Sequence, residues 1–79
     1  MSISSMLSAA RSALDGKATV RGGTMDYLEG GKFQKIEIRI VSKSGEADTL
    51  TATLLPTDDI DARARTLALE WIYAQAAGG

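Results

Sequence analysis

Three aspartates, Asp58, Asp59 and Asp61, form the densest group of acidic side chains in the sequence. Clustered carboxylates can transfer protons or bind a divalent cation, so this group is the first candidate for chemistry. The 79 residues contain no cysteine and no histidine, which removes thiolate nucleophiles, the most common general base and the most common metal ligand. The aspartates also follow Thr57 and precede an apolar segment, where helix capping favours acidic residues. We therefore expect them to cap a helix, in a protein with no enzymatic activity, metal or cofactor.

The charged residues are distributed unevenly along the chain. Nine Lys and Arg face ten Asp and Glu, a formal net charge of −1, so the whole protein has no field that would collect nucleic acid or an anionic membrane. Residues 16–45 hold six basic and three acidic side chains, whereas residues 46–79 hold six acidic and two basic ones. No segment approaches the roughly 18 apolar residues of a membrane span, so we expect a cytoplasmic protein with no membrane partner.

Apolar residues at helical spacing predict one helix near each end of the chain. The first is expected over residues 4–14, capped by Ser2 or Ser4 and ended by Asp15-Gly16, with these residues on one face: Ile3, Met6, Leu7, Ala10 and Leu14. The second follows the three aspartates, and its core face is predicted to hold Ile60, Ala64, Leu67, Ala68, Trp71, Ile72 and Gln75. Leu69 and Tyr73 form a second apolar stripe beside that face, which we expect to pack within the molecule.

Three strands are predicted between the helices. Residues 33–43 alternate isoleucines with polar side chains, and residues 49–54 alternate threonines with apolar side chains. In residues 17–29, Val20 and Met25 would lie on opposite faces of a regular strand, so we expect a β-bulge at Gly22-Gly23. A two-residue hairpin is expected at Gly30-Gly31, and a second short turn at residues 44–46.

These elements predict an α+β fold in a single domain over residues 1–79. Its order is α-β-β-β-α, with both helices on one face of a three-stranded antiparallel sheet. The opposite face would then meet solvent, with Leu28 opposite Phe33, Asp26 opposite Lys35, Arg39 opposite Thr51 and Lys35 opposite Leu55. Apolar and arginine side chains in a mixed patch are typical of protein interfaces. The expected partner-binding residues are therefore Leu28, Phe33, Lys35, Arg39, Thr51 and Leu55.

The element order resembles that of the double-stranded-RNA-binding domain. That family binds phosphate through lysines at the start of its last helix, and residues 57–61 here are Thr-Asp-Asp-Ile-Asp, so RNA binding is not expected. The three strands and last helix also resemble the arm-type DNA-binding domain of tyrosine integrases, whose sheet enters the major groove. Lys17, Lys35, Arg39 and Lys43 would suit that role, whereas Glu37 in the middle of the face opposes it. DNA binding through the sheet is therefore the alternative function.

The small size, the element order and the lack of catalytic residues together resemble the small inhibitors of phages and mobile elements, including anti-CRISPR proteins. This resemblance implies a protein-binding module, a monomer or a homodimer, in the cytoplasm of a bacterial host cell. Its partner would be a protein complex such as a type I CRISPR surveillance complex, whose binding of target DNA it would block; nucleic acid is the less favoured partner. A second, acidic patch could meet a basic DNA-binding groove in place of phosphates, with Glu46, Asp48, Asp58, Asp59 and Asp61 as its residues.

Overall fold

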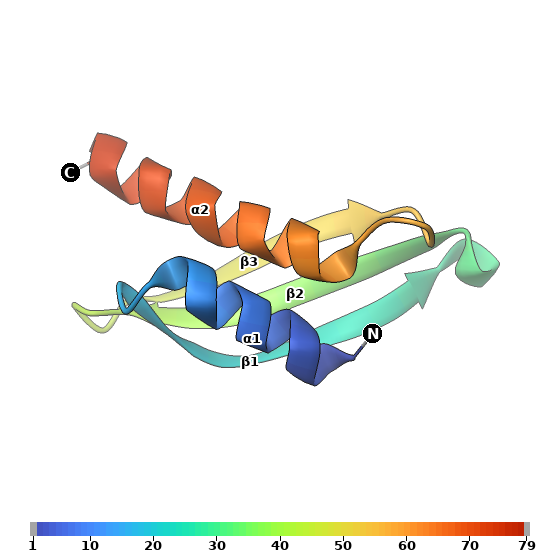
Figure 1. Cartoon of the computed structure of the whole chain (residues 1–79), viewed down its shortest axis with the longest axis horizontal. Helices are drawn as coiled ribbons and strands as arrows, with labels where there is room; N and C mark the ends of the chain where they lie inside the picture. The colour runs from blue at the N-terminus through green and yellow to red at the C-terminus, as the bar shows by residue number, and fades with distance from the viewer. Residues whose placement is uncertain (1, 79) are drawn as a thin grey trace.

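A computed structural model describes residues 2–78 and confirms the predicted α+β fold. Two helices pack on one face of a three-stranded antiparallel sheet whose spatial order is β1-β2-β3 (Figure 1). Both helices begin at the same end of the molecule and run in the same direction. The elements are α1 (Ile3–Leu14), β1 (Ala18–Leu28), a short 3₁₀ turn (Glu29–Gly31), β2 (Phe33–Ser42), β3 (Ala47–Leu54) and α2 (Ile60–Gly78).

Helix α1 begins and ends close to the predicted residues. The Ser2 hydroxyl accepts a hydrogen bond from the backbone N–H of Ser5 at 3.1 Å, which satisfies one of the free donors of the first turn. Asp15 ends the helix in the left-handed conformation, with φ of 50°. Met6, Ala10 and Leu14 lie four residues apart and are fully buried, so one narrow stripe of α1 faces the sheet.

The β-bulge in β1 lies one residue earlier than predicted. Val20 pairs with Ile40 and Gly22 pairs with Arg39, so Arg21 is the extra residue in the strand. The extra residue reverses the alternation of side chains along β1. As a result Val20 is buried on the helix side, and Met25 packs against the same core from the other half of the strand.

The first hairpin has the predicted pairs but a longer loop. Leu28 pairs with Phe33 and Asp26 with Lys35, as expected. Residues 29–32 form a four-residue loop rather than a two-residue turn, because Glu29 adopts a φ of 49° and leaves the strand. The two glycines have φ of 68° and 93°, values that only glycine adopts easily.

The second hairpin corrects the predicted register by two residues. Arg39 pairs with Thr49, not Thr51, and Lys35 pairs with Thr53, not Leu55. The turn is tighter than expected because the Ser42 backbone bonds across it, donating to the Glu46 carbonyl at 2.8 Å and accepting from the Gly45 N–H at 2.9 Å. A shift of two residues keeps every side chain on its predicted face, but it leaves Leu55 beyond the end of β3.

The core lies between the sheet and the two helices. Ile36, Ile38 and Ile40 are at most 1% exposed, and the buried residues of α2 are Ile60, Ala64, Leu67, Ala68 and Trp71. The predicted burial of Trp71 is confirmed, and its indole N–H donates to the Asp48 carboxylate at 2.9 Å. The sequence predicts Gln75 on this face, but its side chain is exposed, where the C-terminal end of α2 draws away from the sheet (Figure 1). Within the described residues, neither helix is long and apolar enough to cross a membrane.

Candidate functional site

Neither helix covers the face of the sheet that points away from α1 and α2 (Figure 1). We call it the open face. Its middle row comes from β2, whose isoleucines fill the core while the residues between them point the other way. The pairing adds one row from β1 and one from β3. The open face consists of Thr19, Gly22, Thr24, Asp26 and Leu28, then Phe33, Lys35, Glu37, Arg39 and Val41, then Ala47, Thr49, Thr51 and Thr53.

The structure brings five of the six predicted partner-binding residues onto this face. Leu28 and Phe33 are opposite each other at one end, where both are half-buried. Lys35, Arg39 and Thr51 follow, and the last two are exposed. The sixth residue, Leu55, is 52% exposed but lies in the turn after β3, where its N–H donates to the Asp58 carboxylate at 2.9 Å.

Charged side chains occupy the middle row of the open face, and threonine hydroxyls flank them on the neighbouring strands. Glu37 is half-buried and accepts a hydrogen bond from the Thr24 hydroxyl at 3.2 Å. The next row places Asp26 opposite Lys35, and Thr49, Thr51 and Thr53 form an exposed line of hydroxyl groups along β3. The face therefore offers hydrogen-bond donors and acceptors beside an apolar end, without one dominant sign of charge.

Arg39 has a special position at the β-bulge. Its guanidinium lies over Gly22, and a Cβ atom added there would be 2.5 Å from the Arg39 Nη2 atom. The close approach requires a residue without a side chain on the opposite strand. The sequence predicts only the bulge for this glycine, because the contact with Arg39 depends on the exact register after the extra residue.

The predicted acidic patch is divided between the two ends of the molecule. Glu46 and Asp48 lie where β3 begins, whereas the other three aspartates lie beyond its far end, around the start of α2. The six strand residues after Asp48, which span about 20 Å, separate the two groups. The structure therefore does not bring the five acidic residues together.

Most of these carboxylates bond within the chain. Asp59 caps α2, with its carboxylate accepting from the Ala62 N–H at 3.1 Å, as the sequence predicts. Asp61 accepts from the Ser5 hydroxyl of α1, which joins the beginnings of the two helices, and its other oxygen is buried without a hydrogen-bond partner. Because the two helices are parallel, the positive ends of their dipoles lie side by side. The negative charge of the aspartates offsets the repulsion between these two ends.

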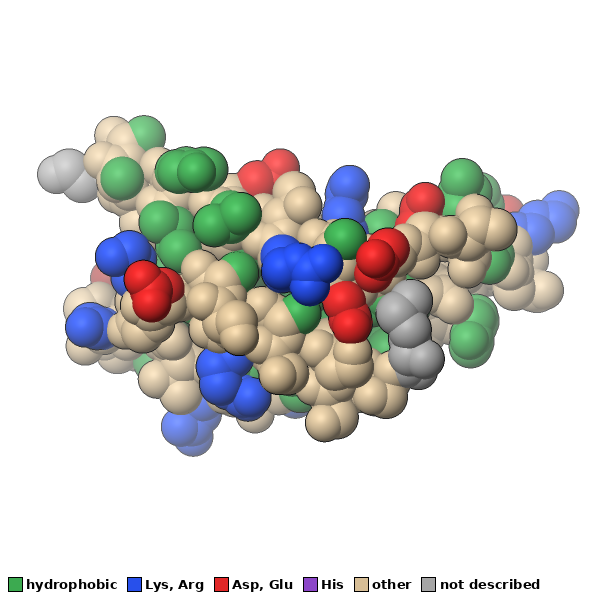
Figure 2. All heavy atoms as spheres, viewed as in Figure 1, with side chains coloured by type: hydrophobic (Ala, Val, Ile, Leu, Met, Phe, Trp, Pro, Cys, Tyr) green, Lys and Arg blue, Asp and Glu red, His purple; other side chains and the backbone are tan. Residues whose placement is uncertain are grey.

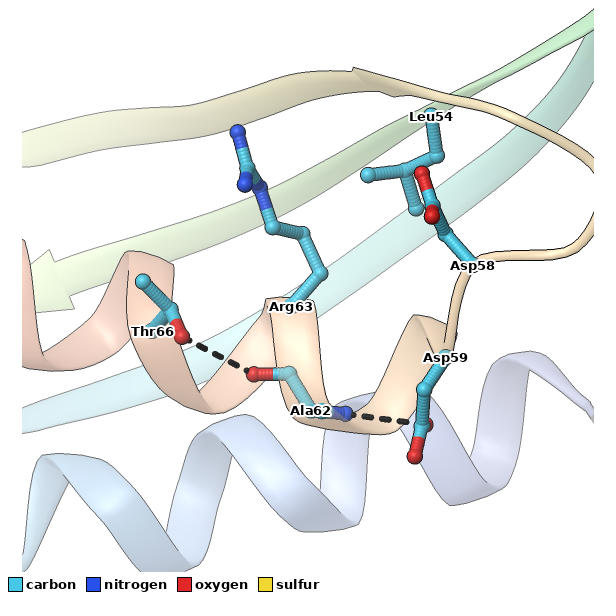
Figure 3. Close-up of a pocket in the computed structure, with 6 residues that line it drawn as sticks. All are labelled: Leu54, Asp58, Asp59, Ala62, Arg63 and Thr66. Carbon is cyan, nitrogen blue, oxygen red and sulfur yellow. Dashed lines mark hydrogen bonds between the residues drawn. The ribbon is translucent and has the colours of Figure 1, made fainter.

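A hollow of about 280 Å³ lies beside the start of α2 (Figure 3). Three of its four polar side chains, those of Asp58, Asp59 and Thr66, bond within the chain. Asp59 holds the Ala62 N–H, and the Thr66 hydroxyl donates to the Ala62 carbonyl at 3.1 Å. No group of three or more metal-ligating side chains occurs among residues 2–78. The hollow is lined by Leu54, Asp58, Asp59, Ala62, Arg63 and Thr66.

The helix side of the molecule carries a separate apolar surface. The sequence predicts that its residues pack within the molecule, and the structure leaves them exposed. Leu69 is 42% and Tyr73 is 68% exposed, so the second stripe of α2 does not pack against another element. Figure 2 shows hydrophobic side chains gathered over the C-terminal half of this helix. Tyr27, at the far end of β1, is also 70% exposed.

Searches against protein-family models, curated proteins and solved structures find no match to this chain.

Proposed function

We propose that the protein is a non-enzymatic binding module whose working surface is the open face of the sheet. The observation that carries the proposal is the asymmetry of the fold, in which both helices cover one side of the sheet and leave the other uncovered. A partner would meet an apolar end, Leu28 and Phe33, followed by the long cationic side chains of Lys35 and Arg39. Such a mixture of apolar contact and charged hydrogen-bond donors is typical of protein interfaces.

The partner that we propose is a protein complex of a bacterial cytoplasm, specifically a type I CRISPR surveillance complex. The support is the class-level resemblance to small inhibitors of phages and mobile elements. A compact domain with one free face can obstruct a DNA-binding surface simply by occupying it, which needs no catalytic group. The acidic residues contribute less to this proposal, because they lie in two separate groups and most of them hold local structure.

A binding assay with a purified type I surveillance complex and labelled target DNA tests this function. The wild-type protein is expected to reduce the fraction of DNA bound when it is added first. Arg39→Glu and Phe33→Ala should weaken this inhibition, whereas Arg65→Glu should not, because Arg65 is exposed on α2 at the helix side. If the wild-type protein leaves DNA binding unchanged at a large excess, the proposed inhibitor function is wrong.

DNA binding through the same face is the second candidate function. It is favoured by the exposed threonine hydroxyls of β3 beside Lys35 and Arg39, which could contact phosphates and base edges. Fluorescence anisotropy with a labelled duplex distinguishes the two candidates. DNA binding predicts an affinity that falls steeply between about 50 and 200 mM salt. A flat salt response, or no binding at low salt, would exclude it.

A further inference from the structure

The β-bulge creates a local site that the rest of the sheet does not repeat. At this point two residues of β1, Arg21 and Gly22, oppose the single residue Arg39 of β2. Arg21 therefore lies beside Gly22 on the strand that faces Arg39, and both arginines are exposed. Thr49 lies opposite Arg39 on the other side, so a hydroxyl group borders the same site.

Gly22 leaves the space that the Arg39 guanidinium occupies. A Cβ atom at this position would be 2.5 Å from Nη2 and 3.4 Å from Cζ of Arg39. The backbone does not require glycine here, since Gly22 is not among the residues with positive φ. Glycine at this position therefore makes room for the arginine side chain, and is not required by a positive backbone φ.

The N–H groups of the Arg39 guanidinium are available to a binding partner. Among residues 2–78, no hydrogen bond or ion pair engages the Arg39 side chain. The nearest carboxylate along the strand belongs to Glu37, which accepts from the Thr24 hydroxyl. Arginine presents a planar fork of N–H groups that matches the two oxygens of a carboxylate or phosphate.

We infer that Arg39, held over Gly22 and bordered by Arg21, binds a carboxylate side chain of the protein partner. This inference rests on the proposed function and names the chemistry of the contact. A carboxylate fits better than a nucleic-acid backbone, because a row of phosphates needs several cations along its path. Here Glu37 and Asp26 interrupt the cations of the open face and would repel neighbouring phosphates, whereas a single carboxylate avoids them.

Nuclear magnetic resonance titration of the labelled protein tests the site at low salt, with a short end-blocked peptide that carries one glutamate among neutral residues. The Arg39 Nε–H and the backbone amides of Gly22 and Thr49 are expected to shift together. Arg39→Gln should weaken binding about tenfold, the loss of one charged hydrogen-bonded contact. Gly22→Ala should weaken it severalfold although every charge remains, because the added methyl group displaces the guanidinium. Arg65→Gln on α2 is the matched control and should change the affinity less than about twofold.

Several results would overturn the inference. If the peptide does not shift the resonance of the Arg39 Nε–H, no specific carboxylate site exists. The same follows if Arg39→Gln and Arg65→Gln lose equal affinity for the peptide. Unchanged binding by a folded Gly22→Ala variant would remove the positioning role of the glycine. A short DNA duplex that binds the same residues more tightly than the peptide would reassign the site to nucleic acid. The inhibition assay with the surveillance complex is independent of this titration, so failure of the proposed function and failure of the carboxylate site can be told apart.

Discussion

Replacement of Gly23 by alanine is expected to destabilise the fold more than the same change at its neighbour Gly22. Gly23 lies on the helix side of β1, opposite Ile38, where α1 crosses the strand. A Cβ atom there would be 2.6 Å from the Glu37 carbonyl oxygen and 2.8 Å from a methyl carbon of Leu7. The carbonyl belongs to the central strand and cannot rotate away, so α1 or the pairing of β1 with β2 has to shift.

The size of the effect follows from the cost of overpacking a well-filled core, about 1–3 kcal/mol. In a domain of this length each kcal/mol lowers the melting temperature by about 4–8 °C. Urea unfolding followed by Trp71 fluorescence measures the change in the free energy of unfolding directly, since this is the only tryptophan and it lies in the core.

Gly22→Ala is the matched control for this experiment. Its added methyl group meets only the end of the flexible Arg39 side chain, so it should change the free energy of unfolding by less than about 0.5 kcal/mol. If Gly23→Ala unfolds at the same urea concentration as the wild-type protein, the packing of α1 against β1 is looser than described. If the two alanine variants lose equal stability, the distinction between the two glycines is wrong.

Substitutions at three further positions test the packing and capping of α2. Trp71→Ala should lower the free energy of unfolding by about 3–5 kcal/mol, because it empties the core and leaves Asp48 without its indole donor; a melting temperature near that of the wild type would contradict the burial of this side chain. Asp48→Ala should cost about 1 kcal/mol in urea unfolding and Asp48→Asn less, because an amide oxygen can still accept from the indole; equal losses would argue against the hydrogen bond. Asp59→Ala should cost about 1 kcal/mol by removing the helix cap, whereas Asp59→Ser should be nearly neutral in calorimetry, and a loss as large as that of the alanine variant would argue against capping.

The faces of the elements could be predicted from the sequence because the spacing of side chains is fixed by the backbone. Alternation in β2 placed Ile38 in the core, and helical spacing placed Trp71 there. Val20 and Met25 would lie on opposite faces of a regular strand, and this conflict indicated the bulge. The register of the second hairpin could not be predicted in the same way, since it depends on how the Ser42 backbone closes the turn.

The candidate site was predictable in outline but not in detail. Alternation alone placed Phe33 and Arg39 on the uncovered side of the sheet. The contact between Arg39 and Gly22 requires the exact pairing after the bulge, which periodicity does not provide. The division of the acidic residues could have been anticipated, because most of a strand lies between Asp48 and Asp58 in the sequence. The bond from Trp71 to Asp48 joins elements that only the folded chain brings together.

One helix precedes the three strands in the sequence and the other follows them. The core can therefore be completed only after the ribosome has made the last helix. Until α2 docks, the meander exposes Ile36, Ile38 and Ile40 to water on one side and has unpaired backbone groups along both outer strands. Chains in this state associate readily through apolar surface and strand edges. Translation of the 19 residues of α2 takes about 1–4 s at ribosomal speed. The yield of folded protein in a cell therefore depends on how fast α2 docks, as well as on the stability of the finished domain.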